Sequence, residues 1–250
     1  MAKAVLKNVR LFAGAIDLTG VGNKIDWANE VDEKETTTFG SYDATSQKVW
    51  YECIGGLGKA KIAASGHTDF GAGLVDEVLW NAKGTIGPWS AYPDAASEGS
   101  LAYLANAHQG NIAAFGQVGD VAPWSANWSS SSAVARGVGL HNPATARTAT
   151  GNGTGVQHVA VASGKTLYAG LHVLSASGTT PSVTVKVQSS VDNTFAAPTD
   201  RITFTAATAA TSEFKSLAGP ITDTWYRVVF TISGTTPSFL FLTTLGIGAL

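Results

Sequence analysis

Ser182-Val-Thr-Val-Lys-Val-Gln-Ser189 is the stretch that decides the fold class of this chain. Its valines occupy every second position, and threonine, lysine and glutamine alternate with them. Because side chains alternate between the two faces of a β-strand, this pattern predicts a strand with one face buried and one face in water. Such strands are typical of antiparallel sheets, which can cover a core on one side only.

The surrounding residues, from 156 to 250, repeat this kind of pattern. Strands are expected at 157–161, 166–174, 182–189, 201–206, 213–217, 225–232 and 238–247. Short strands separated by glycine and proline turns indicate an antiparallel β-sandwich of the jelly-roll type. Ser177-Gly-Thr-Thr-Pro181 recurs as Ser233-Gly-Thr-Thr-Pro237, and the sequence leaves open whether this reflects one hairpin chemistry used twice or chance.

Residues 1–145 are also predicted to form short strands, together with one helix. Apolar side chains at helical spacing predict a helix over residues 73–82, and Gly84 follows it as a stop signal. Strands are expected at 4–12, 23–31, 58–67, 85–86, 100–106, 111–115, 122–128 and 133–140. The chain is therefore predicted to be all-β with a single packed helix.

Residues 146–155 are the predicted linker, because they are rich in threonine and glycine and have no apolar periodicity. Residues 1–145 carry ten Lys and Arg against fourteen Asp and Glu (10 − 14 = −4), whereas residues 146–250 carry six against four (6 − 4 = +2). This change in charge supports two domains, 1–145 and 156–250.

The composition limits the classes of function. A net charge of −2 over 250 residues gives no general attraction to nucleic acid or to a membrane surface. Cys53 is the sole cysteine, which excludes an intramolecular disulfide. We see neither the apolar core of a signal peptide nor an apolar run that could span a bilayer, so we expect a soluble protein that folds in a reducing cytoplasm.

No catalytic, cofactor-binding or metal-binding set is predicted, so we expect no enzyme. His67 and Asp69 lie close in sequence, but nothing marks the third member that a catalytic site would need. Lys59 is followed by alanine, where a phosphate-binding loop needs serine or threonine. Asp192 and Asp200 could bind calcium between sandwich strands, but a turn is the simpler interpretation of Val-Asp-Asn-Thr.

An acidic run opens the most distinctive segment, Asn29-Glu-Val-Asp-Glu-Lys-Glu-Thr-Thr-Thr-Phe-Gly40. Turn residues follow it, and then the glycine-rich run Ile54-Gly-Gly-Leu-Gly-Lys-Ala-Lys-Ile-Ala-Ala-Ser-Gly66. Taken as a series with Val118-Gly-Asp-Val-Ala-Pro-Trp-Ser125, these segments resemble the tail tube (major tail) proteins of long-tailed bacteriophages. The second half is similar to a β-sandwich appended to some of these proteins, in residues 189–195, 200–205 and 219–225.

The resemblance implies a tail-tube-like β-sandwich or barrel with one packed helix, followed by a decoration domain outside the tube. It implies homohexameric rings that stack into the tail tube of the virion, the conduit for DNA delivery. The implied partners are further copies of this chain, the tape measure protein, the tail terminator and tip proteins, and phage DNA passing without sequence-specific binding. Neither a cofactor nor a membrane is implied.

Three sets of site residues are predicted for such a tube. Residues 40–57 form a long segment with several aromatic residues and no strand periodicity, which favours an inter-ring loop. Its predicted assembly residues are Ser41, Tyr42, Trp50 and Tyr51. The segment before it is the predicted subunit contact: Thr36, Thr37, Thr38 and Phe39. DNA must slide through without sticking, so acids are expected to line the bore, with candidates Asp26, Glu30, Asp32, Glu33, Asp69 and Asp120. Alternatively, these acids lie on the outer surface or in ion pairs between rings.

The tryptophans offer an alternative function. Trp80 is expected in the core under the helix, and Trp225 in the core of the sandwich. Trp124 and Trp128 are four residues apart in an extended segment, which places both on one face of a strand. An exposed pair of this kind can bind sugars or partner chains, so a glycan-binding β-sandwich or a tail-fibre adhesion module stays open. The sequence favours core packing for at least one of the two rings.

Overall fold

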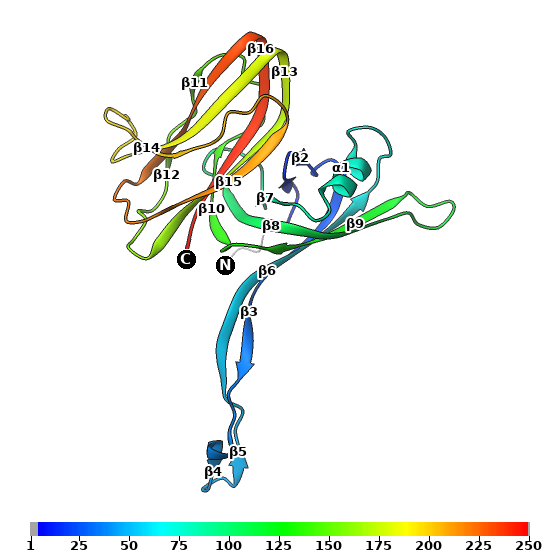
Figure 1. Ribbon diagram of the computed structural model, residues 1–250, viewed down its shortest axis with the longest axis vertical. Coiled ribbons are helices and arrows are strands. Elements are labelled where there is room, and N and C mark those ends of the chain that lie inside the picture. The colour runs from blue at the N-terminus through cyan, green and yellow to red at the C-terminus, as the bar shows by residue number, and fades with distance from the viewer. Residues whose placement is uncertain (1–4, 250) are drawn as a thin grey trace.

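The structure is a computed structural model that describes residues 5–249 (Figure 1). Its regular structure is almost entirely β, which confirms the predicted fold class. The first half contains β1 Arg10–Ala13, β2 Ile16–Asp17, β3 Gly22–Glu35, a 3-10 turn Phe39–Ser41, β4 Tyr42–Asp43, β5 Lys48–Val49, β6 Cys53–His67, α1 Val75–Ala82, β7 Ile86–Tyr92, β8 Leu101–Ala114, β9 Pro123–Ser130 and β10 Ala135–His141. The second half contains β11 Gly151–Asn152, β12 Val156–Gln157, β13 Lys165–Ser190, β14 Thr199–Thr203, β15 Thr211–Ala218 and β16 Trp225–Ala249.

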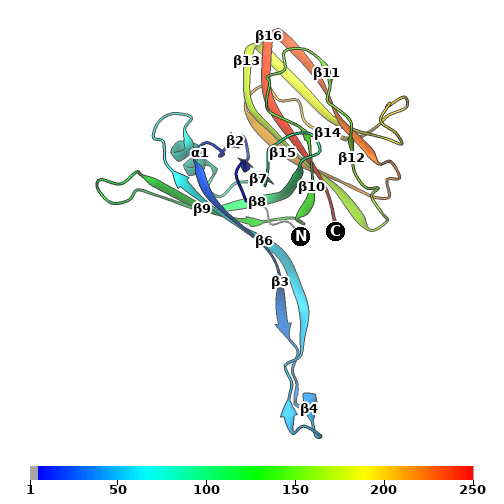
Figure 2. The same cartoon turned by 180° about the vertical axis from the view of Figure 1, so that it is seen from behind.

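Strands of both halves belong to one sheet, hydrogen-bonded in the order β14-β13-β16-β10-β8-β7-β1-β2. A branch runs from β8 through β9 and β6 to β3, while β4 and β5 form a separate small hairpin. Figures 1 and 2 show three regions: a sandwich built from β13 to β16, a smaller sheet beside α1, and a long arm of β3 and β6 that projects away from both.

The sandwich is built from one long ribbon of β13 and β16 that folds over on itself. The two strands pair antiparallel, with irregular register where Ser177–Pro181 meets Ser233–Pro237. Gly178 and Gly234 have φ of 116° and 118°, and a Cβ on either would clash with backbone of the other repeat. The two copies of Ser-Gly-Thr-Thr-Pro are therefore partners at a single bend, and the apolar core lies between the two halves of the ribbon.

A second core lies under α1. Val75 and Leu79 of the helix pack with Trp89, Trp124 and Trp128, and the rings of Trp89 and Trp128 are 4.6 Å apart. The predicted helix is confirmed, and Gly84, with a φ of 84°, follows its end. The helix thereby fixes which face of the neighbouring sheet is buried.

Two expectations about tryptophans are wrong. Trp80 is 64% exposed, because Leu79 faces the sheet and the next residue of a helix points about 100° away. Lys83 lies over the Trp80 ring, with its Nζ 5.1 Å from the ring centroid. Trp225 is half-buried at the start of β16, and the neighbouring Tyr226 supplies the buried ring.

The two halves share packing and hydrogen bonds. β10 lies between β8 and β16 in the sheet. Leu242 of β16 packs with Phe12 and Tyr92, and the Tyr92 hydroxyl lies 2.6 Å from the Thr244 hydroxyl. Removal of the second half would therefore uncover part of the first.

The predicted linker, 146–155, lies along the sandwich. Arg147 forms an isolated bridge with Phe239, and β11 pairs with Val229 and Phe230 of β16. The segment is an edge of the sheet rather than a free connection. The division into domains at 145 and 156 stays a prediction.

A buried histidine links three elements of the two halves. His172 accepts a hydrogen bond at Nε2 from Ser90 Oγ, 2.8 Å away, because its Nδ1 faces the carbonyl oxygen of Gly14 at 2.6 Å and must donate. Burial lowers the pKa of His172 to about 4. Burial and the nearby Arg147 guanidinium likewise lower the pKa of His141 to about 4. Ser90 and His172 are both fully buried, so this pair is a structural link and no substrate reaches it.

We expect the protein to lose stability as the pH falls from 6.5 towards 4. The unfolded chain takes up protons on His141 and His172 near pH 6.5, whereas the folded chain keeps both neutral down to about pH 4. Each histidine contributes about 3 kcal/mol to this loss. Denaturant unfolding at pH 7 and pH 4.5 measures it, and His172→Gln should lose markedly less stability between these values than the wild type. Equal losses would contradict the assignment.

Candidate assembly surface

The candidate site begins with a four-stranded sheet in the order β3, β6, β9 and the end of β8 (Figure 1). The register places alternate residues of each strand on opposite faces. Side chains on the face towards α1 are apolar and buried, among them Ile62, Trp124 and Ala126. The opposite face, called the bare face from here on, is exposed.

The bare face carries small polar side chains. Ser125, Asn127 and Ser129 are exposed on β9, and each is paired with a residue of β6 on the same face. Asn111 of β8 continues the row, because its register partner is Asn127. These side chains form a polar row across β9 and β8.

Charged residues of β3 and β6 are paired on the bare face. Three lysine–carboxylate pairs lie there, with Nζ–oxygen distances of 2.9, 2.9 and 3.3 Å: Lys24–Asp26, Lys61–Glu30 and Lys59–Asp32. Lys59 holds the pKa of Asp32 below its ordinary range, and Glu30 raises the pKa of Lys61. Exposed pairs of this kind add little stability, but they keep the face close to neutral.

Each outer strand of this sheet has an unpaired edge within the described chain. β3 is 14 residues long and pairs only with β6. β8 pairs with β7 as far as His108, so residues 111–114 pair only with β9. Exposed edges offer free N–H and C=O groups to a further strand. The sheet can therefore be extended at both of its sides.

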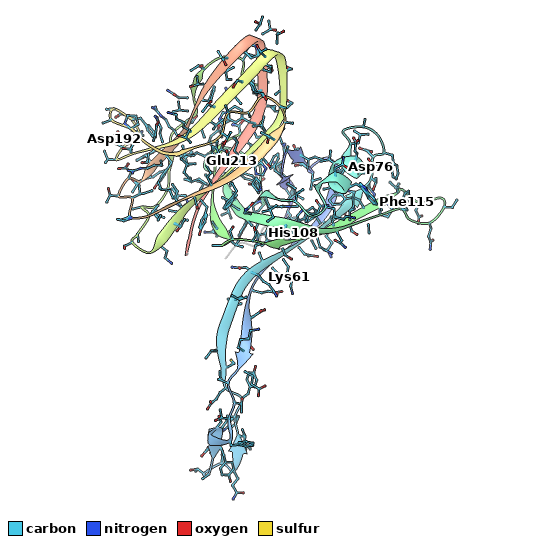
Figure 3. The ribbon with its side chains drawn as sticks, viewed as in Figure 1. Lys61, Asp76, His108, Phe115, Asp192 and Glu213 are labelled. Carbon is cyan, nitrogen blue, oxygen red and sulfur yellow. The ribbon has the colours of Figure 1, made fainter. Side chains whose placement is uncertain are left out.

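β3 and β6 continue beyond the sheet as a two-stranded arm (Figures 1 and 3). β6 pairs with β9 only from Lys61 onward, so residues 31–35 and 53–58 pair with each other alone. Figure 3 places Lys61 at the root of the arm, where it leaves the body. The arm carries the rest of the acidic run that the sequence singled out.

The tip of the arm, residues 36–52, brings the predicted contact segments together. The Thr36 N–H donates to the Glu52 carbonyl at 2.8 Å, and the Glu52 N–H donates to Thr37 Oγ1 at 3.0 Å. The Thr38 side chain caps the 3-10 turn, and β4 and β5 close the tip. The tip is thus a defined hairpin rather than an irregular loop.

The tip and the outer arm expose apolar and aromatic side chains. Phe39 is fully exposed, and Trp50 and Tyr51 are exposed by 58% and 60%. Ile54 and Leu57 continue the apolar surface at 60% and 76%. Exposed apolar groups gathered in one place mark an interaction surface. Contacts of the tip with another subunit stay a prediction.

The six predicted bore acids do not gather in one place. Three of them share the bare face: Asp26, Glu30 and Asp32. The other three are spread over the arm, the segment between β6 and α1, and the turn between β8 and β9: Glu33, Asp69 and Asp120. Whether any of these acids lines a bore stays a prediction.

Sequence reasoning missed a second exposed apolar patch, beside α1. Phe70 and Phe115 stack with ring centroids 5.8 Å apart, and Trp80 lines the same hollow. Phe70 lies in the segment between β6 and α1, and Phe115 begins the turn between β8 and β9; neither segment has strand or helix periodicity. The isolated aromatic residue in each loop was the only signal available.

The remaining sequence candidates have structural roles. Trp124 and Trp128 are 1% and 4% exposed, so neither ring is available to a sugar. Asp192 accepts hydrogen bonds from Thr194 in a turn, and Asp200 accepts from Lys186. Among residues 5–249, no group of three His, Cys, Asp or Glu side chains could hold a metal ion. Over the same range, no helix is both long and apolar enough to cross a bilayer.

No protein-family model and no curated protein matches this chain. Among solved structures, a chain from the virion of a native gene transfer agent (GTA) particle aligns at a TM-score of 0.41 and 14% identity, over 54% of this chain and 98% of that one. A chain from the tail of an empty GTA particle aligns at 0.35 and 15%, over 51% and 92%. The SPP1 Dit protein, described as a hub adsorption apparatus in phages infecting Gram-positive hosts, aligns at 0.36 and 11%, over 97% and 100%. TM-scores and identities this low do not establish a shared function.

Proposed function

We propose that this chain is a structural, non-enzymatic subunit that closes into rings and stacks into a phage tail tube, the conduit for DNA. The observation that carries the proposal is the four-stranded sheet of β3, β6, β9 and β8. It has an unpaired edge on each side, one face sealed by α1, and one bare polar face. A ring of such sheets would have a continuous polar inner wall.

Ring closure follows from the two edges. The edge of β3 and the edge of β8 are different surfaces, so pairing between copies is heterologous, and such contacts close into a ring when the rotation permits. Closure removes both open edges, which otherwise invite uncontrolled pairing. Six copies per ring is the number implied by the resemblance to tail tube proteins.

The bare face is the proposed wall of the bore. Phosphates bind arrays of lysine and arginine, and the lysines of this face already have carboxylate partners. Serine and asparagine side chains of β9 and β8 continue the same face beside them. A nearly neutral, hydrated wall suits DNA that must pass without being held.

The arm is the proposed contact between rings. It projects beyond the sheet, so its tip can reach a neighbouring ring while the sheet edges stay engaged within their own ring (Figure 2). Ser41, Tyr42, Trp50 and Tyr51 are the proposed inter-ring residues, and Thr36 to Phe39 the proposed subunit contact. The sandwich lies away from the bare face and is proposed to decorate the outside of the tube. Tape measure, terminator and tip proteins are the further partners that a tail tube implies.

Negative-stain microscopy and sedimentation of the purified chain test the proposal. Rings or tubes are expected, with a population that grows with protein concentration. The alternative, a glycan-binding or adhesion module, predicts a monomer or trimer, and the burial of Trp124 and Trp128 removes its proposed sugar platform. A chain that stays monomeric at all concentrations would contradict tube formation.

The pairing of charges on the bare face predicts a change in DNA retention. Glu30→Gln with Asp32→Asn leaves Lys61 and Lys59 without their acids, so assembled protein should retain duplex DNA at low salt and release it as salt rises. Co-sedimentation with labelled DNA measures this. Asp200→Asn with Glu213→Gln makes the same charge change on the sandwich and serves as the matched control. Equal retention by both double variants would rule out this face as the bore wall.

A further inference from the structure

A groove of about 670 Å³ lies between α1 and the end of β8. Its lining includes Phe70, Trp80 and Phe115, together with residues 112–114 of β8. Phe70, Trp80 and Phe115 are exposed by 51%, 64% and 78%. Figure 3 shows Phe115 and Asp76 near one another at this end of the molecule, away from the arm. The groove therefore exposes aromatic side chains to solvent, next to the acids Asp76 and Glu77.

Phe115 is held in an unusual backbone conformation. Its φ is 76°, in the left-handed region that bulky residues rarely adopt. This conformation accompanies the stacking of its ring on Phe70, at an interplanar angle of 19°. Strained residues tend to mark functional sites rather than loops that serve only as connections. The groove thus has a wall set in place by the backbone.

We propose that this groove receives the arm tip of a second copy of the chain, and thereby joins successive rings. The inference rests on the proposed function and names the partner surface of its inter-ring contact. The tip exposes Phe39, Trp50 and Tyr51, which match the aromatic walls of the groove in chemistry. Aromatic anchors that fill apolar pockets are the usual centres of protein interfaces.

Charge supports the same pairing. Asp76 and Glu77 line the groove, whereas Lys48 lies at the tip with its Nζ 5.7 Å from the Trp50 ring centroid. Each of the two acids uses one oxygen to accept a hydrogen bond from a backbone N–H before α1, and within residues 5–249 its other oxygen accepts none. A lysine that arrives with Trp50 would meet these carboxylates at the rim. Complementary charge favours the correct register over other dockings.

The tip and the groove lie on different parts of the chain, so the same contact can repeat from one copy to the next. The arm leads away from α1 in Figures 1 and 2, so the tip cannot reach the groove beside the α1 of its own chain. Tip and groove are different surfaces, and contacts of that kind continue from copy to copy until they close or form a filament. The backbone groups at the edge of β8 close the ring, whereas side chains of the same residues and of α1 receive the tip and extend the stack.

Cross-linking through Cys53 tests this contact. Cys53 is exposed and directly follows the tip, and the variant Ala114→Cys adds a second thiol in the groove. A short bis-maleimide should then link Cys53 of one copy to the thiol at position 114 of another and give a ladder of covalent multimers. Val191→Cys, an exposed position on the sandwich, is the matched control and should give no such ladder. A ladder that is equal in both variants would overturn the proposal.

Weakening the groove provides an independent measurement. Trp80→Ser and Phe115→Ser change exposed side chains, so the subunit should still fold and form rings, while the concentration needed for tubes rises about tenfold or more. Normal stacking by both variants, together with wild-type tubes, would overturn the groove and leave the proposed function standing. If the wild type formed neither rings nor tubes, the proposed function itself would fail.

Discussion

Replacing Ser41–Tyr51 by an Asn-Gly turn is expected to abolish tube formation and leave a folded subunit. Asn-Gly favours reversal of the chain, and the backbone hydrogen bond from Thr36 to Glu52 is kept at the base of the shortened loop. The removed residues contain β4, β5 and most of the exposed aromatic surface of the tip, but nothing that is buried in either core. Stability should therefore change by less than about 1 kcal/mol, because the deleted side chains are solvent-exposed.

Microscopy of the assembled protein and thermal unfolding measure the two parts of this prediction. A milder variant, Trp50→Ser with Tyr51→Ser, should raise the concentration needed for tubes without changing the unfolding temperature. Val159→Ser with Val191→Ser removes two comparably exposed apolar side chains far from the tip and should assemble normally. Tubes that form normally from the deletion variant would show that the tip is not an assembly element.

Part of the arm could be predicted from the sequence and part could not. The turn chemistry and aromatic content of residues 40–57 predicted a functional segment, and the alternation at 23–31 predicted a strand. The outward continuation of β6 was missed, because Gly55-Gly56-Leu57-Gly58 has no alternating pattern to mark a strand. A two-stranded ribbon with both faces in water lacks the apolar–polar contrast on which strand prediction depends.

The long strands of the sandwich illustrate a second limit. Alternation predicted residues 166–174 and 182–189 as separate strands, whereas β13 runs through both. Gly178 and Pro181, which lie between these two segments, are typical of a turn. They instead form a bend in a continuous ribbon, because the second Ser-Gly-Thr-Thr-Pro copy lies opposite them. Whether the strand continues through the bend depends on pairing between segments that are distant in the sequence, and a local sequence pattern does not contain that information.

The candidate groove was outside the reach of sequence reasoning for the same reason. Phe70 and Phe115 are far apart in the chain and meet only because β6, α1 and β8 pack together. The spacing of Trp124 and Trp128 did predict a shared face, but spacing alone could not say that α1 covers it. Sequence periodicity identifies which residues share one face of a strand, whereas tertiary packing determines which element covers that face.

Separating the two halves is expected to have opposite effects on their folding. A fragment of residues 146–250 should fold alone, because within the described chain its core takes few side chains from the first half: Leu140, Val138 and the His141 ring that stacks on Phe241. A fragment of residues 1–145 should not. It loses β16 as the partner of β10, and it uncovers Tyr92 and Leu104.

The size of the loss supports this asymmetry. Each large apolar side chain that returns to water costs about 1.5–3 kcal/mol, and several such losses approach the total stability of about 5–15 kcal/mol for a domain. Ser90 and Tyr92 also lose the hydrogen-bond partners that they have in His172 and Thr244. Circular dichroism and amide exchange of the two fragments measure the outcome. A 1–145 fragment that folds and builds tubes would instead make the sandwich a separable decoration, whereas recovery of the native fold on mixing both fragments would demonstrate the shared core.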